Sequence, residues 1–298
     1  MVKSNILAIV VTYNRKDLLE ECINALVNSK YKTDILVIDN ASSDGTSDFI
    51  EEIMKENKNI FYRTTGSNLG GAGGFNFGVK EAFKMNYEYL WIMDDDTIVH
   101  EDALSELISK AKKINNKFSF LSSIALWKDR ELCKMNIQEI SDSAIKSYYT
   151  IADGLVNIES ASFVSCLINT EIAKKVGLPI KEFFIYGDDL EYTKRLSTIE
   201  KGYLVPTSIV NHKMKTNDGI DIIGAEESRI DRYFYSYRNL LYVFKKYNKK
   251  EFRIFKIKCY YLILKVLVKS KKYKFRRIKV LIRALIEYRL FNPTIETY

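Results

Sequence analysis

Short apolar runs alternate with stretches of helical spacing along the first part of the chain. The runs predict buried strands at Ile6–Val11, Ile35–Ile38, Ile60–Tyr62 and Tyr89–Met93. Apolar residues at helical spacing predict helices at about Arg15–Asn28, Thr46–Lys55, Phe75–Met85 and Glu101–Ile114. Strands that alternate with helices imply crossover connections, so the pattern predicts an α/β fold with a mostly parallel sheet.

The alternation weakens after Ile114. Apolar runs still predict strands in Phe118–Leu126, Ala161–Ile168 and Tyr203–Val210, the last as several short strands, and short helices at Glu171–Val176 and Leu190–Ser197. From Ser228 the pattern is helical nearly to Leu290. A polar stretch with two glycines, residues 217–224, separates the two parts. We therefore expect an α/β domain over residues 1–224 and a helical region over residues 225–298.

Charge changes this picture for the helical region. The chain has a net charge of +8, yet residues 241–290 alone hold 17 Lys and Arg against two Glu. Apolar residues recur there at helical spacing, for example Ile254, Ile257, Tyr261 and Leu264. A basic amphipathic helix of this kind is typical of an anionic membrane surface, and packing on the α/β domain or on a second subunit is the alternative. Nucleic acid is disfavoured, because residues 1–240 are net acidic.

The spacing of the cysteines and the lengths of the apolar runs indicate where in the cell the protein is found. The four cysteines form no C-x-x-C pair and have mostly apolar neighbours, which predicts buried free thiols and a reducing cytoplasm. Ile6–Val11 is too short for a signal-peptide core, and no run reaches the roughly 20 apolar residues of a transmembrane helix. We expect a cytoplasmic protein that attaches peripherally to the inner face of the cell membrane.

Three carboxylates, Asp94-Asp95-Asp96, follow the strand predicted at Tyr89–Met93. Ligands of open α/β sheets bind just beyond the carboxyl ends of strands. Adjacent carboxylates repel each other unless a positive charge lies among them, and Mg²⁺ takes oxygen ligands that it shares with substrate phosphates. The triplet therefore indicates a site for Mg²⁺ or Mn²⁺, and a solvated acidic turn is the alternative.

Polar residues also follow the first two predicted strands. Thr12, Tyr13 and Arg15 come after the first strand and Asp39 after the second. These positions lie at the sheet edge where a nucleotide would dock. The carboxylate of Asp39 is able to accept hydrogen bonds from ribose hydroxyls or a base, and a turn aspartate is the alternative.

Glycine is concentrated before the third helix. Six of the 13 glycines fall between Gly66 and Gly78. Glycine lets a backbone approach a ligand closely, and a helix beginning favours an anion. The segment is neither a dinucleotide fingerprint, because Asn76 stands at the last glycine position, nor a phosphate loop with adjacent Gly-Lys. We expect a glycine-rich ligand loop that ends before Phe75, with a tight turn as the alternative.

Two further groups have the chemistry of a catalytic site. Asp188 and Asp189 stand between an aromatic run and a predicted helix, where one carboxylate is placed to act as a general base and Asp188 is suited to cap the helix. His212 follows the strands predicted at Tyr203–Val210. It is either an additional metal ligand or a structural histidine.

Taken in order, these motifs resemble the family 2 glycosyltransferases of the GT-A fold over roughly Ile6–Lys246. The matching segments are Val11–Arg15, Val37–Thr46, Asn68–Phe75, Asp94–Asp96, Gly177–Pro179 with Phe184–Arg195, and Tyr235–Asn239. The glycine-rich third segment is most similar to bacterial galactofuranosyltransferases and then to rhamnosyltransferases.

The resemblance implies roles for the matching positions. The nucleotide pocket would be lined by Thr12, Tyr13, Arg15 and Asp39, and the donor would be enclosed by Asn68, Gly70 and Gly71. In the D-x-D metal motif, Asp94 and Asp96 would hold the metal and Asp95 would lie nearer the sugar. Asp189 matches the catalytic base of inverting members, and His212 matches a histidine that completes the metal site in galactofuranosyltransferases.

The resemblance thus implies an inverting enzyme that uses Mn²⁺ or Mg²⁺ and a UDP- or dTDP-sugar. The best match is transfer of galactofuranose from UDP-galactofuranose onto a hydroxyl of a growing cell-surface polysaccharide or lipid-linked glycan, with dTDP-rhamnose as the alternative donor. A nucleotidyltransferase and an inactive glycan-assembly scaffold are the alternatives of other classes. An anionic membrane and a second subunit are the further expected partners.

Overall fold

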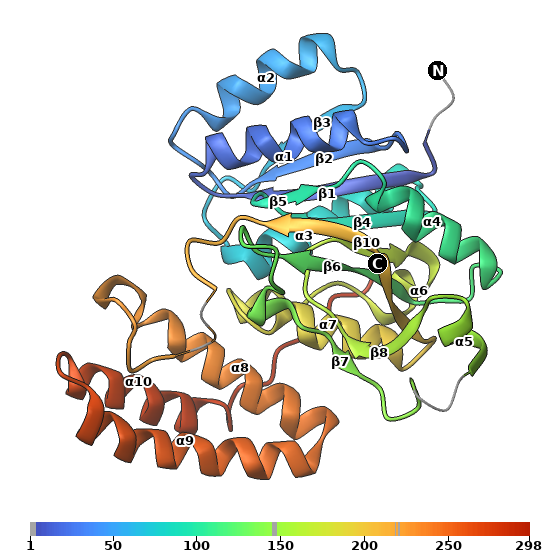
Figure 1. Ribbon diagram of the computed structural model, residues 1–298. Helices are drawn as coiled ribbons and strands as arrows, with labels where there is room; N and C mark the ends of the chain where they lie inside the picture. Colours follow the sequence, from blue (N-terminus) through green and yellow to red (C-terminus); the bar gives the residue numbers. More distant parts are fainter. Residues whose placement is uncertain (1–3, 145–147, 218, 220) are drawn as a thin grey trace.

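The computed structural model describes residues 4–144, 148–217, 219 and 221–298 and confirms the α/β class (Figure 1). One central sheet begins with four parallel strands in the order β3-β2-β1-β4. They are β1 (Ile6–Thr12), β2 (Asp34–Asp39), β3 (Ile60–Thr64) and β4 (Tyr89–Asp94). Because parallel strands point the same way, the polar residues that end them gather at one edge of the sheet.

The other half of the sheet is mixed rather than parallel. β9 (Cys166–Asn169) lies antiparallel between β4 and β6 (Phe120–Leu126), and β10 (Gly202–His212) runs parallel to β6. The short strands β5 (Thr97–Val99) and β8 (Val156–Ser160) pair antiparallel with β10, and β7 (Glu139–Ile140) pairs with β8. The prediction of several short strands around residues 203–210 is wrong, because one bulged strand spans the segment and ends on His212.

Helices cover both faces of the sheet, because the strands bury both of their faces. In β1, Ile6, Ala8 and Val10 face one core and Leu7, Ile9 and Val11 the other. The first core is closed by α1 (Lys16–Asn28), α2 (Thr46–Glu56) and α4 (Ala103–Lys113). The second is closed by α3 (Gly70–Met85), α6 (Thr170–Val176) and α7 (Asp188–Ser197). The short α5 (Tyr148–Ala152) precedes β8.

The glycine-rich segment is helical, so the prediction of a loop up to Phe75 is wrong. Helix α3 begins at Gly70 and includes Gly71, Gly73 and Gly74. A Cβ at Gly74 would stand 2.5 Å from Val11 Cγ1, and a Cβ at Gly78 would stand 2.8 Å from Ile9 Cγ2. Neither distance is tolerable between carbon atoms. These glycines let α3 pack directly on the first strands of the sheet.

Three C-terminal helices form a separate layer, which we call the helical unit (Figure 1). It consists of α8 (Arg232–Tyr247), α9 (Lys249–Lys269) and α10 (Lys274–Glu287). Its own core includes Phe234, Leu241, Val266 and Leu281. Asn248 separates α8 from α9, and its side chain accepts hydrogen bonds from the backbone N–H groups of Lys250 and Glu251.

The last residues of the chain return to the α/β part. The N–H of Leu178 donates to the carbonyl of Glu296 at 2.8 Å, and Phe291 packs on Phe183 with 5.7 Å between ring centroids. The proposed boundary at residue 224 stays a prediction, and residues 218 and 220 of the segment 217–224 lie outside the described residues. The four cysteines are buried and free, as expected. None of the described helices combines the length and the apolar character needed to cross a bilayer.

Candidate active site

The carboxyl edge of the parallel strands brings most of the predicted site residues together. Strand pairing places Val11 beside Asp94 and Thr12 beside Asp39. The hydroxyl of Thr12 donates to Asp95 Oδ2 at 2.8 Å. Two strands that are distant in sequence thus share one polar rim.

Asp94, Asp95 and Asp96 form the carboxylate cluster of this rim. Arg15 Nη1 lies 3.1 Å from Asp95 Oδ1 and 2.9 Å from Asp96 Oδ2. Among the described residues, Arg15 is the only Lys or Arg paired with the cluster, and no side chain there donates a hydrogen bond to Asp94. The three carboxylates therefore exceed the positive charge that the described residues supply.

Burial and mutual repulsion appear in the pKa values of the carboxylate cluster. Burial, followed by the charges of Asp96 and Asp95, raises the pKa of Asp94 well above its ordinary value. Burial raises the pKa of Asp95 to about 6 against the opposing effect of Arg15. Burial acts in the same direction on Asp96, but the hydrogen bond and charge of His212 outweigh it and lower the pKa. The cluster as built favours an additional positive charge.

His212 completes a set of three candidate metal ligands. One ligand atom each from Asp94, Asp96 and His212 lies within 4.8 Å of the others. The end of β10 carries His212 beside Thr97 of β5, directly after the cluster in sequence. Two carboxylate oxygens and an imidazole nitrogen are ligands that Mn²⁺ accepts, and Mg²⁺ fits the carboxylate oxygens. The described residues thus fit a divalent cation.

Asn136 orients His212, and sequence patterns did not predict this role. His212 Nδ1 lies 2.8 Å from Asn136 Oδ1, and Asn136 Nδ2 donates to Ser162 Oγ at 2.9 Å. Because the asparagine oxygen faces the ring, Nδ1 carries the proton. Nε2 then faces Asp96 Oδ1 at 3.0 Å, where it either donates the hydrogen bond that lowers the Asp96 pKa or offers its lone pair to a cation. Two lone-pair atoms at this distance favour a cation between them or a proton on the ring.

A second pair of carboxylates lies near the first cluster. Asp188 is the first residue of α7, and its charge contributes to the raised pKa of Asp94. Burial, then the charge of Asp189, raises the pKa of Asp188 to about 8, while burial raises the pKa of Asp189 to about 6. The prediction that Asp188 caps the helix is wrong, because Gly187 takes that position with a φ of +82°.

The loop before α7 is held by two neighbouring side chains from the middle of α8. Asn239 Nδ2 donates to the carbonyls of Phe183, Ile185 and Tyr186 at 2.7–3.1 Å, and Arg238 donates to Asn239 Oδ1. Phe184 and Tyr186 have positive φ values of 63° and 66°, which are uncommon for large side chains. Asn239 thus stabilises an unusual loop that places Asp188 and Asp189, a role that the match of the segment Tyr235–Asn239 did not indicate.

The predicted nucleotide residues lie around the same rim with different exposure. Tyr13 is 42% exposed, whereas Asp39 is buried. Asp39 already accepts hydrogen bonds from the N–H of Ser42 and the hydroxyl of Tyr62, which is the pattern of a turn aspartate. The Asn68 side chain accepts from the N–H of Gly70.

Gly70 and Gly71 differ in their surroundings. Gly70 has a φ of +73°, and a Cβ there would stand 2.1 Å from the carbonyl oxygen of Phe184. The N–H of Ala72 donates to that same oxygen at 3.1 Å. Gly70 therefore joins the beginning of α3 to the loop before α7, while Gly71 has open space around it.

Similar structures share this fold. Staphylococcus aureus TarS superposes with a TM-score of 0.62 at 16% identity, covering 95% of this chain and 48% of TarS. GalNAc-T7 with UDP, GalNAc and Mn²⁺ superposes with a TM-score of 0.65 at 14% identity, covering 97% of this chain and 57% of that chain. At these identities the likeness shows the fold alone, which is the GT-A fold.

Comparison of sequences shows the family as well as the fold. Galactofuranosyltransferase GlfT1 of Mycolicibacterium smegmatis is 26% identical over 261 residues, covering 79% of this chain and 82% of the relative. Poly-beta-1,6-N-acetyl-D-glucosamine synthase of Staphylococcus aureus is 33% identical over 129 residues, and the match spans only 30% of that protein. The family model described as glycosyl transferase family 2 matches residues 7–176, more than half of the chain. The protein therefore belongs to glycosyl transferase family 2.

Proposed function

We propose that this protein is an inverting glycosyltransferase that depends on a divalent cation. It moves a sugar from a nucleoside diphosphate onto a hydroxyl of a growing cell-surface polysaccharide or lipid-linked glycan. The observation that carries the proposal is the convergence of Asp94, Asp96 and His212 at the carboxyl edge of the sheet, close to the pair Asp188 and Asp189. Family membership supports the same reaction class.

Asp94, Asp96 and His212 are the residues that would hold the cation. When bound, Mn²⁺ or Mg²⁺ supplies positive charge to the diphosphate of the leaving group. Asp95 stays fixed by Thr12 and Arg15 and lies nearer the sugar. In this proposal Thr12, Tyr13, Arg15 and Asp39 line the nucleotide pocket, and Asn68, Gly70 and Gly71 enclose the donor.

Asp189 is the proposed base. With a pKa of about 6 its carboxyl group is mostly ionised at neutral pH and is able to take the proton of the acceptor hydroxyl. The hydroxyl oxygen then bonds to the anomeric carbon from the face opposite the diphosphate, whose bond to that carbon breaks. Asp188, with a pKa of about 8, keeps its proton at neutral pH and is the less suitable base.

Galactofuranose is the proposed sugar, with UDP as the nucleotide. GlfT1 is a galactofuranosyltransferase by name, and its match extends over most of both chains. The histidine ligand and the glycine-rich beginning of α3 support the same choice. Rhamnose from dTDP-rhamnose is the second candidate, because the glycine-rich segment is also similar to rhamnosyltransferases.

A donor panel tests the proposal. The full chain is incubated in Mn²⁺ with UDP-galactofuranose, dTDP-rhamnose, UDP-N-acetylglucosamine or GDP-mannose, and the released nucleotide is identified. We expect UDP from UDP-galactofuranose. Release of pyrophosphate instead of nucleoside diphosphate would indicate a nucleotidyltransferase. Donor binding without turnover, with and without a glycan acceptor, would indicate an inactive scaffold.

A further inference from the structure

The helical unit exposes large apolar side chains in two rows. On α9, Ile257, Tyr261, Leu264 and Val268 are spaced by four, three and four residues, and they are 61–81% exposed. This spacing places them on one side of the helix. On α10, Phe275, Ile282 and Ile286 are 44–85% exposed. We call these seven residues the apolar face.

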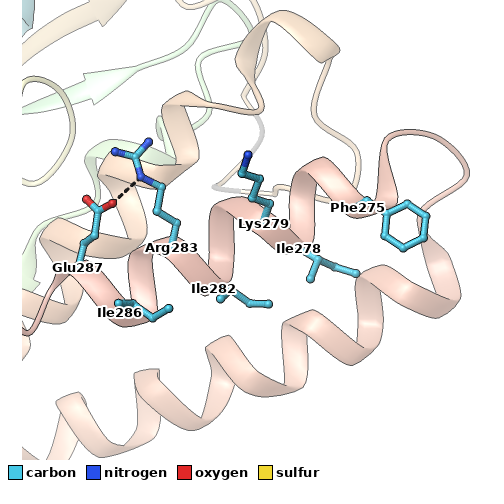
Figure 2. A pocket seen from close by; sticks show the side chains of 7 residues that line it. All are labelled: Phe275, Ile278, Lys279, Ile282, Arg283, Ile286 and Glu287. Carbon is cyan, nitrogen blue, oxygen red and sulfur yellow. Dashed lines mark hydrogen bonds and ion pairs between the residues drawn. The ribbon is translucent and has the colours of Figure 1, made fainter.

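The row on α10 borders an open hollow. Figure 2 shows Ile278, Ile282 and Ile286 in line along one side of the helix, with Phe275 at its beginning and the side chains of Lys279 and Arg283 on the opposite side of the hollow. Figure 1 shows α9 as the helix farthest from the sheet. The core of the helical unit lies on the other sides of the two helices, around Cys259, Val266, Leu281 and Leu285. The apolar face therefore has no partner among the described residues.

Basic side chains flank the apolar face. Lys258 and Lys265 stand three or four residues from members of the α9 row, and Lys269 stands four residues after Lys265, so the three lysines follow one border of the row along the helix. Residues 241–290 hold 17 Lys and Arg against Glu251 and Glu287, and Glu287 is paired with Arg283 at 2.6 Å. Two copies that met through such surfaces would bring like charges together. An anionic surface complements both the charge and the exposed apolar residues.

We propose that the apolar face and its lysines dock the enzyme onto an anionic lipid bilayer. The apolar side chains enter the boundary between headgroups and acyl chains, and the lysine stems lie along them while their ammonium groups meet lipid phosphates. Tyr260, Tyr261 and Tyr273, all more than 40% exposed, are the side chains that favour this boundary. The inner face of the cell membrane is the surface we assign. The proposal does not depend on which sugar is transferred.

Vesicle binding by the full chain tests the docking directly. The probes are vesicles of pure phosphatidylcholine and of an equimolar mixture of phosphatidylcholine and phosphatidylglycerol. We expect sedimentation with the anionic vesicles to exceed that with the neutral ones by at least about tenfold, since each Lys or Arg adds about 1 kcal/mol near an anionic surface. Added salt should weaken it. Equal binding to both vesicles, or to neither, would overturn the proposal.

Matched variants locate the surface. The triple variant Tyr261→Ser, Leu264→Ser, Val268→Ser should lose about tenfold or more in anionic-vesicle binding, because it removes apolar area that the parent buries in the bilayer. Its control replaces exposed apolar residues of the α/β part, Ile137→Ser, Ile140→Ser and Ile199→Ser, and should bind like the parent. Equal loss in both would overturn the assignment.

The charges are tested separately, so that a folding defect in one variant does not decide the outcome. Lys258→Gln, Lys265→Gln and Lys269→Gln together should lose at least about tenfold, while Lys112→Gln, Lys113→Gln and Lys117→Gln on and after α4 should not. Light scattering at rising protein concentration tests the second copy. If the parent dimerises but does not bind vesicles, and the apolar triple variant abolishes the dimer, then the apolar face docks a second subunit and not a membrane.

Discussion

The carboxylate cluster and the helical unit hold unbalanced charge in opposite ways. Asp95 and Asp96 are buried and fixed by named partners, whereas Lys258 and Lys269 of α9 are exposed and Lys265 is half-buried. A buried charge is costly and its position is set by few atoms, so it serves one ligand in one geometry. Exposed charges act together and at longer range, so they serve a surface. Single substitutions should therefore be severe at the sheet edge and mild on the helical unit.

The largest effect is expected at Asp189. Asp189→Asn removes an ionised carboxylate and should reduce kcat by about 10²–10⁴-fold while donor binding persists. Asp188→Asn is the matched control, because an amide resembles the protonated carboxyl group that a pKa of about 8 implies. Steady-state kinetics in Mn²⁺ measure both. A near-normal kcat for Asp189→Asn would remove Asp189 from the role of base.

The second largest effect is expected for Asp96→Ala. It removes a proposed ligand and leaves His212 and Arg15 without their common carboxylate. Removing a residue that only hydrogen-bonds to a metal ligand costs about 10–100-fold in metal affinity. Removing a ligand itself should therefore cost at least that much. Calorimetry of donor binding with and without Mn²⁺ measures the change. Unchanged Mn²⁺-dependent affinity would contradict the assignment.

Asn136→Ala extends the comparison to a residue that touches no proposed ligand except His212. Without its oxygen, the ring loses the partner that keeps the proton on Nδ1, so Mn²⁺ affinity should fall about 10–100-fold. Asn136→Asp keeps an acceptor at that position and should retain more affinity than Asn136→Ala. Equal affinities for the two variants would show that the hydrogen bond to His212 does not matter.

Acidic pH should act through the buried carboxylates, Asp189 first. The raised pKa of Asp189 means that the folded enzyme binds a proton there as pH falls through about 6, which removes the base. At saturating donor, kcat should be level above this pH and fall about tenfold per unit below it. Because Asp95 also titrates near pH 6, donor affinity is measured in parallel. A kcat that stays level well below pH 6 would contradict the proposed base.

The smallest effect is expected for one lysine of the helical unit. Lys265→Gln should reduce binding to anionic vesicles by about fivefold, the equivalent of about 1 kcal/mol, and should leave donor binding unchanged. Co-sedimentation and calorimetry measure the two properties. A loss of several hundredfold would show a specific lipid site in place of a shared surface.

The sequence predicted those elements that local patterns determine. The first four strands and the helices between them lie within a few residues of their predicted positions, apart from the beginning of α3, because buried strands and amphipathic helices have characteristic periods. The position of the carboxylate triplet at the carboxyl end of β4 followed from the same reasoning.

Other features depend on contacts between distant residues. The glycine-rich beginning of α3 lacks a side-chain pattern, and its helical state is stabilised by packing on Val11 and Ile9. Asn136 lies 76 residues from His212 in sequence, and Asn239 lies more than 50 residues from the carbonyls that it holds. Single asparagines carry no signal that identifies such partners, so only the fold shows their roles.

The central claim is that Asp94, Asp96 and His212 together bind a divalent cation. The most direct measurement is the anomalous difference density of Mn²⁺ in crystals of the full chain grown with Mn²⁺ and UDP. We predict one strong peak between the two carboxylates and His212 Nε2. A peak elsewhere, or no peak at these residues while UDP is bound, would contradict the account.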